Sequence, residues 1–159
     1  YYGLQAEYHH NSKMGSGNYR ASISGSSKDF LSADRSQLEK RNSVLLSLDQ
    51  EFGKIIGGWL RLGWRSDDAA TNYDAIYSGG IDLKGSAWGR DADNIGLGYA
   101  FLNGGNRDIE ATNVAEAYYR WQLGEMIGLT ADIQYMKDDY KIGQGPSGWI
   151  YSLRATAEF

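Results

Sequence analysis

Charged, amide and aromatic side chains recur at every second position in several segments of this chain, which places them on one face of a strand. Guanidinium and carboxylate groups hydrogen-bond hydroxyl groups, and aromatic rings pack against apolar faces of a ligand. Such a set suits weak, multiple contacts with a small polar solute, although the charges could also simply solvate the face or pair across strands. The candidate residues are Trp59, Arg61, Arg65, Asp82, Lys84, Glu116, Tyr118, Arg120, Asp132, Gln134, Arg154 and Glu158.

Other residues that could carry chemistry do not form a recognisable site. The two histidines, His9 and His10, have serines nearby only in a turn, and no third group orients an imidazole. The stretch Gly96-Leu-Gly98 is not followed by a helix, so it does not predict a nucleotide loop. The chain has no cysteine, and its acidic pairs lack the spacing of a calcium loop. We therefore predict no catalysis, no cofactor and no metal site.

The elements that must position the candidate residues are strands. Apolar and polar residues alternate along nine segments, and no helix pattern separates them, so the connections are antiparallel. At the carboxyl end, for example, Trp149, Tyr151 and Leu153 alternate with Ser152 and Arg154. The predicted segments are residues 2–9, 19–24, 44–52, 56–65, 77–84, 95–101, 115–123, 127–135 and 149–159.

The composition and the aromatic residue Phe159 favour a membrane barrel. A barrel strand needs only ~9–11 residues with alternating lipid-facing and lumen-facing side chains, so the mean hydropathy of the chain can stay low. No apolar run is long enough for a transmembrane helix. The 21 glycines, 12 tyrosines, 5 tryptophans and 1 proline also suit a barrel, and a final aromatic residue is typical of bacterial outer-membrane barrels. The predicted fold is an all-β antiparallel transmembrane β-barrel of the outer-membrane porin type.

The connections between the predicted strands alternate between short and long. Tight turns are expected around residues 53, 89–93 and 124, and longer polar loops at 26–42, 66–76, 103–113 and 137–147. Residues 32–40 could form a turn or two of helix. Bacterial barrels show this asymmetry, with short periplasmic turns and longer extracellular loops. The Trp88–Asp93 segment resembles a motif, but it falls on a turn, where Arg90 is expected to brace the chain through neighbouring carboxylates.

The direction of the strands follows from the last one. If Phe159 lies in the periplasm, Arg154 and Glu158 face the lumen, and Tyr1 lies at the extracellular end. Single-chain bacterial barrels have an even number of strands. We therefore expect residues 1–159 to be the carboxyl-terminal part of a single, larger outer-membrane barrel domain.

Seven segments, in this order and spacing, resemble the carboxyl-terminal half of the carbohydrate-selective porins of the OprB family. The resemblance covers about residues 44–159. The segments are Leu48-Asp-Gln-Glu-Phe-Gly53, Gly57-Gly-Trp-Leu-Arg-Leu-Gly-Trp64, Ser78-Gly-Gly-Ile-Asp-Leu-Lys-Gly85, Trp88-Gly-Arg-Asp-Ala-Asp-Asn-Ile-Gly-Leu-Gly-Tyr99, Glu116-Ala-Tyr-Tyr-Arg120, Leu129-Thr-Ala-Asp-Ile-Gln-Tyr135, and Gly145-Pro146 with Leu153-Arg-Ala-Thr-Ala-Glu-Phe159.

The resemblance implies a barrel of roughly sixteen strands that passes sugars across the outer membrane by diffusion. Among the residues on the polar face, Trp59, Arg61 and Arg120 are expected in the selectivity region because of their donor and aromatic groups. The chain departs from the family pattern at Lys137-Asp-Asp-Tyr140, where the family often has Asn-Pro, and at Thr156, where it often has His. These positions lie near the outer rim or on the closing strand, so they bear on the solute rather than on the fold.

The expected partners are outer-membrane lipid and small polar solutes such as sugars, in the bacterial outer membrane. Porins are commonly homotrimers, so a homotrimer is also an expected assembly. The net charge of −4 argues against a nucleic-acid partner, which would need a concentrated basic face. The alternative function is a structural or partner-docking barrel without selective transport.

Overall fold

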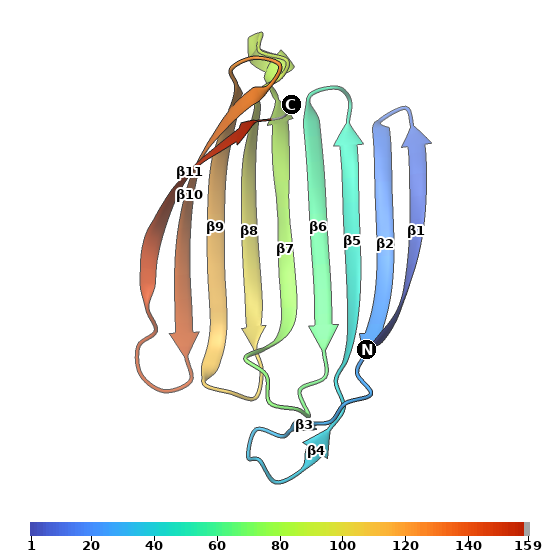
Figure 1. Cartoon of the computed structure of the whole chain (residues 1–159), viewed down its shortest axis with the longest axis vertical. Helices are drawn as coiled ribbons and strands as arrows, with labels where there is room; N and C mark the ends of the chain where they lie inside the picture. Colours follow the sequence, from blue (N-terminus) through green and yellow to red (C-terminus); the bar gives the residue numbers. More distant parts are fainter. Residues whose placement is uncertain (158–159) are drawn as a thin grey trace.

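The structure, a computed structural model, describes residues 1–157, so the predicted places of Glu158 and Phe159 lie outside the described residues. Nine strands form one antiparallel sheet, and their order across the sheet is the same as their order along the chain (Figure 1). The predicted all-β antiparallel fold is confirmed. The sheet consists of β1 (Tyr2–Ser12), β2 (Gly15–Gly25), β5 (Asn42–Phe52), β6 (Ile56–Arg65), β7 (Tyr73–Lys84), β8 (Asn94–Gly104), β9 (Ile109–Gln122), β10 (Ile127–Tyr140) and β11 (Ser147–Ala157).

The register of the sheet places apolar residues opposite apolar residues. Leu4 of β1 lies opposite Ile23, which lies opposite Val44, which in turn lies opposite Trp64. Because side chains alternate between faces, a shift of one residue would bring polar side chains onto this face. The register therefore gives the sheet one apolar face and one polar face.

No second layer covers the apolar face. Among the described residues, only Ala69 and Ala75 are buried hydrophobic residues, whereas Leu4 and Leu153 are 70% and 76% exposed. A sheet that folds in water normally buries its apolar face against another element. An apolar face left bare in this way suits contact with lipid, as in a barrel wall.

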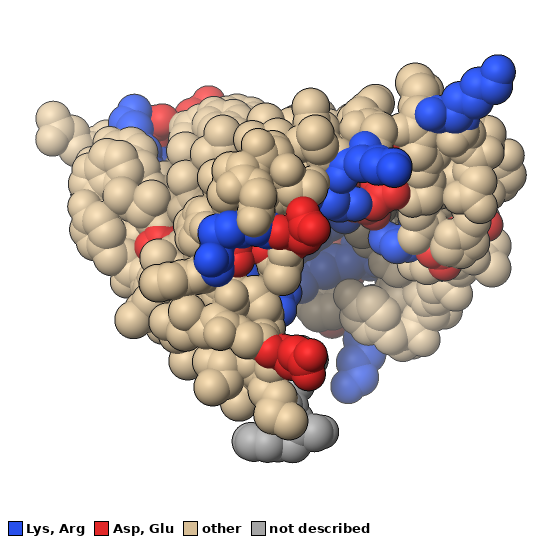
Figure 2. All heavy atoms as spheres, turned by 90° about the horizontal axis from the view of Figure 1, so that it is seen from above, with Lys and Arg blue, Asp and Glu red and all other residues tan. Residues whose placement is uncertain are grey.

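The sheet is curved, and charged side chains gather around the hollow that it partly encloses (Figure 2). Within the described residues, β1 and β11 are the two edges of the sheet and do not pair with each other. The amino terminus lies at the same end of the sheet as the connection between β2 and β5 (Figure 1). We call this end the loop end and the opposite end the turn end.

The lengths of several connections differ from the prediction. The predicted loops 103–113 and 137–147 shrink to residues 105–108 and 141–146, because β8, β9 and β10 continue toward the loop end. There the strands pair through polar residues such as Thr112 and Asp138, which carry no apolar–polar alternation. The strict alternation of short turns with long loops is therefore wrong.

Two connections also have a different internal structure from the one expected. Residues 32–40 contain no helix, because the connection between β2 and β5 is instead a small hairpin of β3 (Phe30–Leu31) and β4 (Leu38–Glu39). The turn between β7 and β8 is longer than predicted and holds the 3₁₀ helix η1 (Gly85–Trp88). No helix within residues 1–157 is long and apolar enough to cross a membrane.

The connections at the loop end are joined into one hydrogen-bonded unit, which we call the collar: residues 26–41, 66–72, 105–108 and Lys141. Asn106 is its hub, because its side chain donates to the carbonyls of Asp67 and Ala69 and accepts from the Thr71 amide at 2.9 Å. Ala70 N donates to Leu31 O at 2.8 Å. The collar thus fixes loops that a sequence pattern alone leaves undefined.

The collar extends to β10 through Lys141. Its backbone N–H donates to Asp108 O at 2.9 Å, and its Nζ donates to Gly105 O at 2.6 Å. Ala69 is fully buried beneath these contacts. The loop end is therefore held by backbone and amide hydrogen bonds rather than by an apolar core.

Candidate functional site

The eleven predicted site residues within the described part of the chain all lie on strands of the sheet. They are Trp59, Arg61 and Arg65 on β6, Asp82 and Lys84 on β7, Glu116, Tyr118 and Arg120 on β9, Asp132 and Gln134 on β10, and Arg154 on β11. Their register positions alternate with those of the apolar residues, so they share the polar face. The structure does not collect them at one point but divides them into groups along this face.

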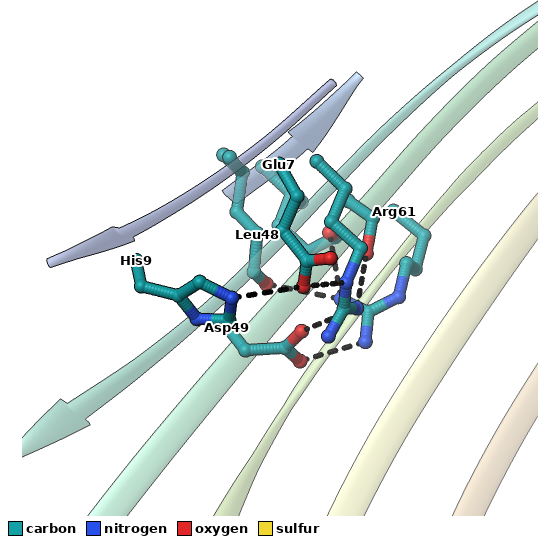
Figure 3. Close-up of polar contacts among 8 residues, drawn as sticks. Glu7, His9, Leu48, Asp49 and Arg61 are labelled. Atoms are coloured by element: carbon teal, nitrogen blue, oxygen red, sulfur yellow. Dashed lines mark hydrogen bonds and ion pairs between the residues drawn. The ribbon is translucent and has the colours of Figure 1, made fainter. Parts of the chain in front are cut away.

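The first group is built around Arg61 and consists of acidic and basic side chains in alternation, which we call the charge ladder: His9, Glu7, Arg20, Asp49 and Arg61 (Figure 3). The Nε of Arg20 lies 2.9 Å from Glu7 Oε1, and its Nη1 lies 3.3 Å from Asp49 Oδ2. The Nη2 of Arg61 lies 2.7 Å from Asp49 Oδ1. Asp49 therefore links the two guanidinium groups across β2, β5 and β6.

Arg61 is held in place by backbone groups as well as by Asp49. Its Nη1 donates to the carbonyl oxygens of Leu48 and Leu60, each at 3.0 Å. The sequence identified Arg61 as a site residue but did not identify Glu7, His9, Arg20 or Asp49. Their positions on the polar face were readable from the alternation, but their contacts depend on the register between strands.

Trp59 lies beside the ladder, over a part of the wall that lacks side chains. The Cζ of Arg61 is 5.4 Å from the Trp59 ring centroid. A Cβ atom at Gly80 would come within 2.7 Å of Trp59 Nε1, and one at Gly98 would lie 3.4 Å from Trp59 Cζ2. The indole thus occupies the space that side chains on β7 and β8 would otherwise fill, and it lies along the wall.

The second group surrounds a cavity of about 710 Å³ on the polar face of β7 to β11. Among the predicted residues in its wall, Asp132 accepts two hydrogen bonds at Oδ1, from Gln134 Nε2 at 3.1 Å and from Ser152 Oγ at 3.0 Å. Its other oxygen, Oδ2, is buried and has no hydrogen-bond partner among the described residues. The predicted residues that line this cavity are Asp82, Lys84, Glu116, Tyr118, Arg120, Asp132, Gln134 and Arg154.

Tyr118 repeats the arrangement of Trp59 in this second group. Its ring lies against Gly96, where a Cβ atom would overlap the ring, and Asn94 Nδ2 donates to its hydroxyl at 3.3 Å. Glycines on β7 and β8 therefore make room for two aromatic rings on the polar face. The rings of Trp59 and Tyr118 fill part of the space that these glycines leave.

The predicted selectivity trio is only partly brought together. Trp59 and Arg61 are neighbours on β6, whereas Arg120 lines the second cavity on β9. Two other predicted basic residues lie at opposite ends of the sheet: Lys84 pairs with Glu51 at 2.6 Å, and Arg65 donates to the Thr71 hydroxyl at 3.2 Å in the collar. Asp82 lines the second cavity and also a neighbouring cavity with His9, Asp49 and Trp59 in its wall.

The turn end is braced by Arg90, as the sequence predicts. Arg90 forms an ion pair with the buried carboxylate of Asp93, which also accepts hydrogen bonds from the Tyr119 hydroxyl and, at 2.9 Å, from the Gln122 amide. The hydrogen bond from Arg90 is the largest of the effects that lower the pKa of Asp93 from 3.8 to about 2. These contacts have a structural role, because they tie the η1 turn to the end of β9.

Within residues 1–157, no group of three or more His, Cys, Asp or Glu side chains lies close enough to hold a metal ion. What the polar face offers is planar donors, carboxylate acceptors and two half-buried aromatic rings. Such groups make reversible contacts with hydroxylated solutes.

Comparisons with known proteins agree on one family and one fold. A family model described as "Carbohydrate-selective porin, OprB family" matches residues 2–138. The match begins well before residue 44, where the resemblance of the sequence motifs begins, and it ends before β11. No curated protein matches the chain.

A solved structure has the same fold. It is the high-pH structure of OprB from Pseudomonas putida, with a TM-score of 0.69 and 14% sequence identity. The match covers 96% of this chain and 48% of the Pseudomonas protein, so the chain spans about half the length of that relative.

Proposed function

Because the chain belongs to the OprB family of carbohydrate-selective porins, we propose that its strands line a channel through which small sugars cross the bacterial outer membrane by passive diffusion. Family and fold together support a porin role. The apolar face contacts lipid, and the polar face borders the solute path. The observation that carries the proposal is the position of Trp59, whose ring lies along a glycine wall beside the paired guanidinium of Arg61.

The geometry of this region suits weak binding of a sugar during passage. A ring that lies along the wall offers a flat apolar surface to a pyranose without blocking the path. Arg61 and Asp49 offer a donor and an acceptor close to that ring, each already partly neutralised by the other at 2.7 Å. Contacts of this strength allow both entry and release, whereas a tight site would stop conduction.

The nine strands also need further strands to work as a channel. We propose that they are the carboxyl-terminal part of a larger single barrel, with β1 and β11 paired to strands of the same barrel. Lipid does not tolerate an open sheet edge, because unpaired backbone N–H and C=O groups cost several kcal/mol each. The length of the Pseudomonas putida OprB structure supports this proposal. Assembly as a homotrimer stays a prediction.

Trp59 and Trp64 provide a matched test, because both lie on β6 but on opposite faces of the sheet. We expect Trp59→Ala to lower glucose flux about two- to tenfold at low sugar concentration, given the usual worth of an aromatic contact. Trp64→Ala should leave it unchanged. The measurement is liposome swelling with the full-length protein.

Equal fluxes for the wild type and Trp59→Ala would overturn the role of Trp59. Single-channel conductance tests the channel itself. If the purified wild-type protein insulates a planar bilayer, the porin proposal fails and the alternative, a structural or partner-docking barrel, takes its place.

A further inference from the structure

The loop end of the polar face carries a second feature that the charge ladder does not explain. A cavity of about 320 Å³ opens there between the ends of β6 and β7 and the collar. Three arginines line it, Arg41, Arg65 and Arg107, together with Asn72 and Tyr73, and no acidic residue contributes to its wall. We call it the arginine pocket.

The guanidinium groups of the arginine pocket are largely unused. Arg41 Nη2 donates to Ala70 O at 2.7 Å, and Arg65 Nη1 donates to Thr71 Oγ1 at 3.2 Å. Among the described residues, none of the three arginines forms an ion pair, whereas Arg20, Arg61 and Arg90 each bind a carboxylate. Since a guanidinium has five N–H donors, most of the donors around the pocket are free for a ligand.

On its Arg41 side the pocket is also preorganised. The Arg41 guanidinium lies 4.0 Å from the ring centroid of Phe30, and Ala70, which accepts from Arg41, belongs to the loop that Asn106 fixes. Groups that are already ordered lose less freedom when a ligand binds, so more of the contact energy appears as affinity.

Three like charges around one small cavity repel one another, and an anion placed between them would remove that cost. The planar fork of a guanidinium matches a carboxylate in two-point geometry. The Asn72 side chain, which makes no hydrogen bond within residues 1–157, can hydrogen-bond a hydroxyl group. The volume lies at the small end of the range for ligand pockets.

We propose that the arginine pocket is an entry site for sugar acids, meaning monosaccharides that carry a carboxylate. This inference rests on the proposed function, because it assigns a substrate class to the mouth of the same channel. The pocket would capture the anionic sugar first and pass it to the charge ladder. There Arg20 and Arg61 are already paired with carboxylates of the protein, so they would bind the sugar acid more weakly.

The test measures binding directly and does not depend on conduction. Isothermal titration calorimetry of the detergent-solubilised full-length protein uses D-glucuronate, D-glucose and inorganic phosphate as probes. We expect the double variant Arg41→Gln/Arg107→Gln to weaken glucuronate binding about tenfold or more, the worth of lost charge-assisted hydrogen bonds. The double variant Arg41→Lys/Arg107→Lys, which keeps the charge, should recover part of that loss.

Arg35→Gln is the matched control, because Arg35 lies on the same connection but does not line the pocket. It should bind glucuronate like the wild type, and heat-modifiable electrophoretic migration checks that each variant is folded. Unchanged affinity in the double Gln variant, an equal loss in Arg35→Gln, or binding of phosphate without glucuronate would each overturn the inference. An absence of glucose flux through the wild type would instead overturn the proposed function. The two failures can be distinguished, because calorimetry measures glucuronate binding whether or not the protein conducts sugar.

Discussion

Asp49 is the residue on which the charge ladder depends, and its removal tests whether the ladder controls ion selectivity. Asp49→Asn keeps the size of the side chain but removes the negative charge between Arg20 and Arg61. Arg20 keeps Glu7 as a partner, whereas Arg61 keeps only the carbonyls of Leu48 and Leu60. The variant therefore leaves one more uncompensated positive charge beside the solute path.

The size of the effect follows from simple electrostatics. An ion passing ~5 Å from a unit charge interacts with it by about 0.8 kcal/mol in bulk water, and by about 0.5 kcal/mol after screening at ~0.1 M salt. Because the lost charge acts in opposite directions on anions and cations, their energies separate by about 1.0 to 1.6 kcal/mol, and the ratio of anion to cation permeability should rise about five- to fifteenfold. The loss of stability should be small, at most ~1 kcal/mol for each lost pair, because the three side chains are about one-third exposed.

The assay is the reversal potential of single channels in a potassium chloride gradient. The control is Asp49→Glu, which keeps the charge and should keep the selectivity of the wild type. An unchanged reversal potential in Asp49→Asn, or a shift toward cation selectivity, would show that the ladder does not border the ion path. Such a result would refute the reasoning even if the protein still conducts sugar.

Two further predictions concern stability at the two ends of the sheet. Asn106→Ala removes three hydrogen bonds from the collar, each worth about 1 kcal/mol, so amide exchange at Thr71 should speed up by at least tenfold, whereas Asn11→Ala at the turn end should leave it unchanged. At the turn end, the pKa of Asp93 is lowered from 3.8 to about 2, so its carboxylate stabilises the fold fully above pH 3.8 and loses this effect as the pH falls through about 2. The free energy of unfolding, measured as a function of pH, should therefore be higher for the wild type than for Asp93→Asn near neutral pH, and the difference should disappear in acid. A difference that does not change with pH would contradict the ion-pair explanation.

Much of the fold could be predicted from the sequence, because alternation has a physical cause. Residues such as Leu60 and Arg61 must face opposite sides of a strand, so the pattern of nine strands and the identity of the polar face follow directly. Strand ends at the loop end could not be found in this way. Thr112 and Asp138 pair there, beyond the apolar part of the sheet. Because polar residues occupy both faces of the strands at this end, the sequence shows no alternation of apolar and polar residues.

The site was predictable only in part for a related reason. Trp59 and Arg61 were identified because they stand on a clearly alternating strand, but their contact with Asp49 depends on the exact turn between β5 and β6. One residue more in that turn would bring a different side chain beside them. The arginine pocket is harder still, because it combines Arg65 at the end of β6 with Arg41 and Arg107 from two connections that are far apart in the sequence.

The order of the strands has a consequence for how the wall is built. Each strand of the sheet pairs only with neighbours that are close in sequence, from Ser12 with Gly15 in the first hairpin to Lys137 with Ser147 in the last. Topologies of this kind have low contact order, and short loops close with little loss of chain entropy. The wall can therefore grow one hairpin at a time along the chain, with each completed strand serving as the template for the next.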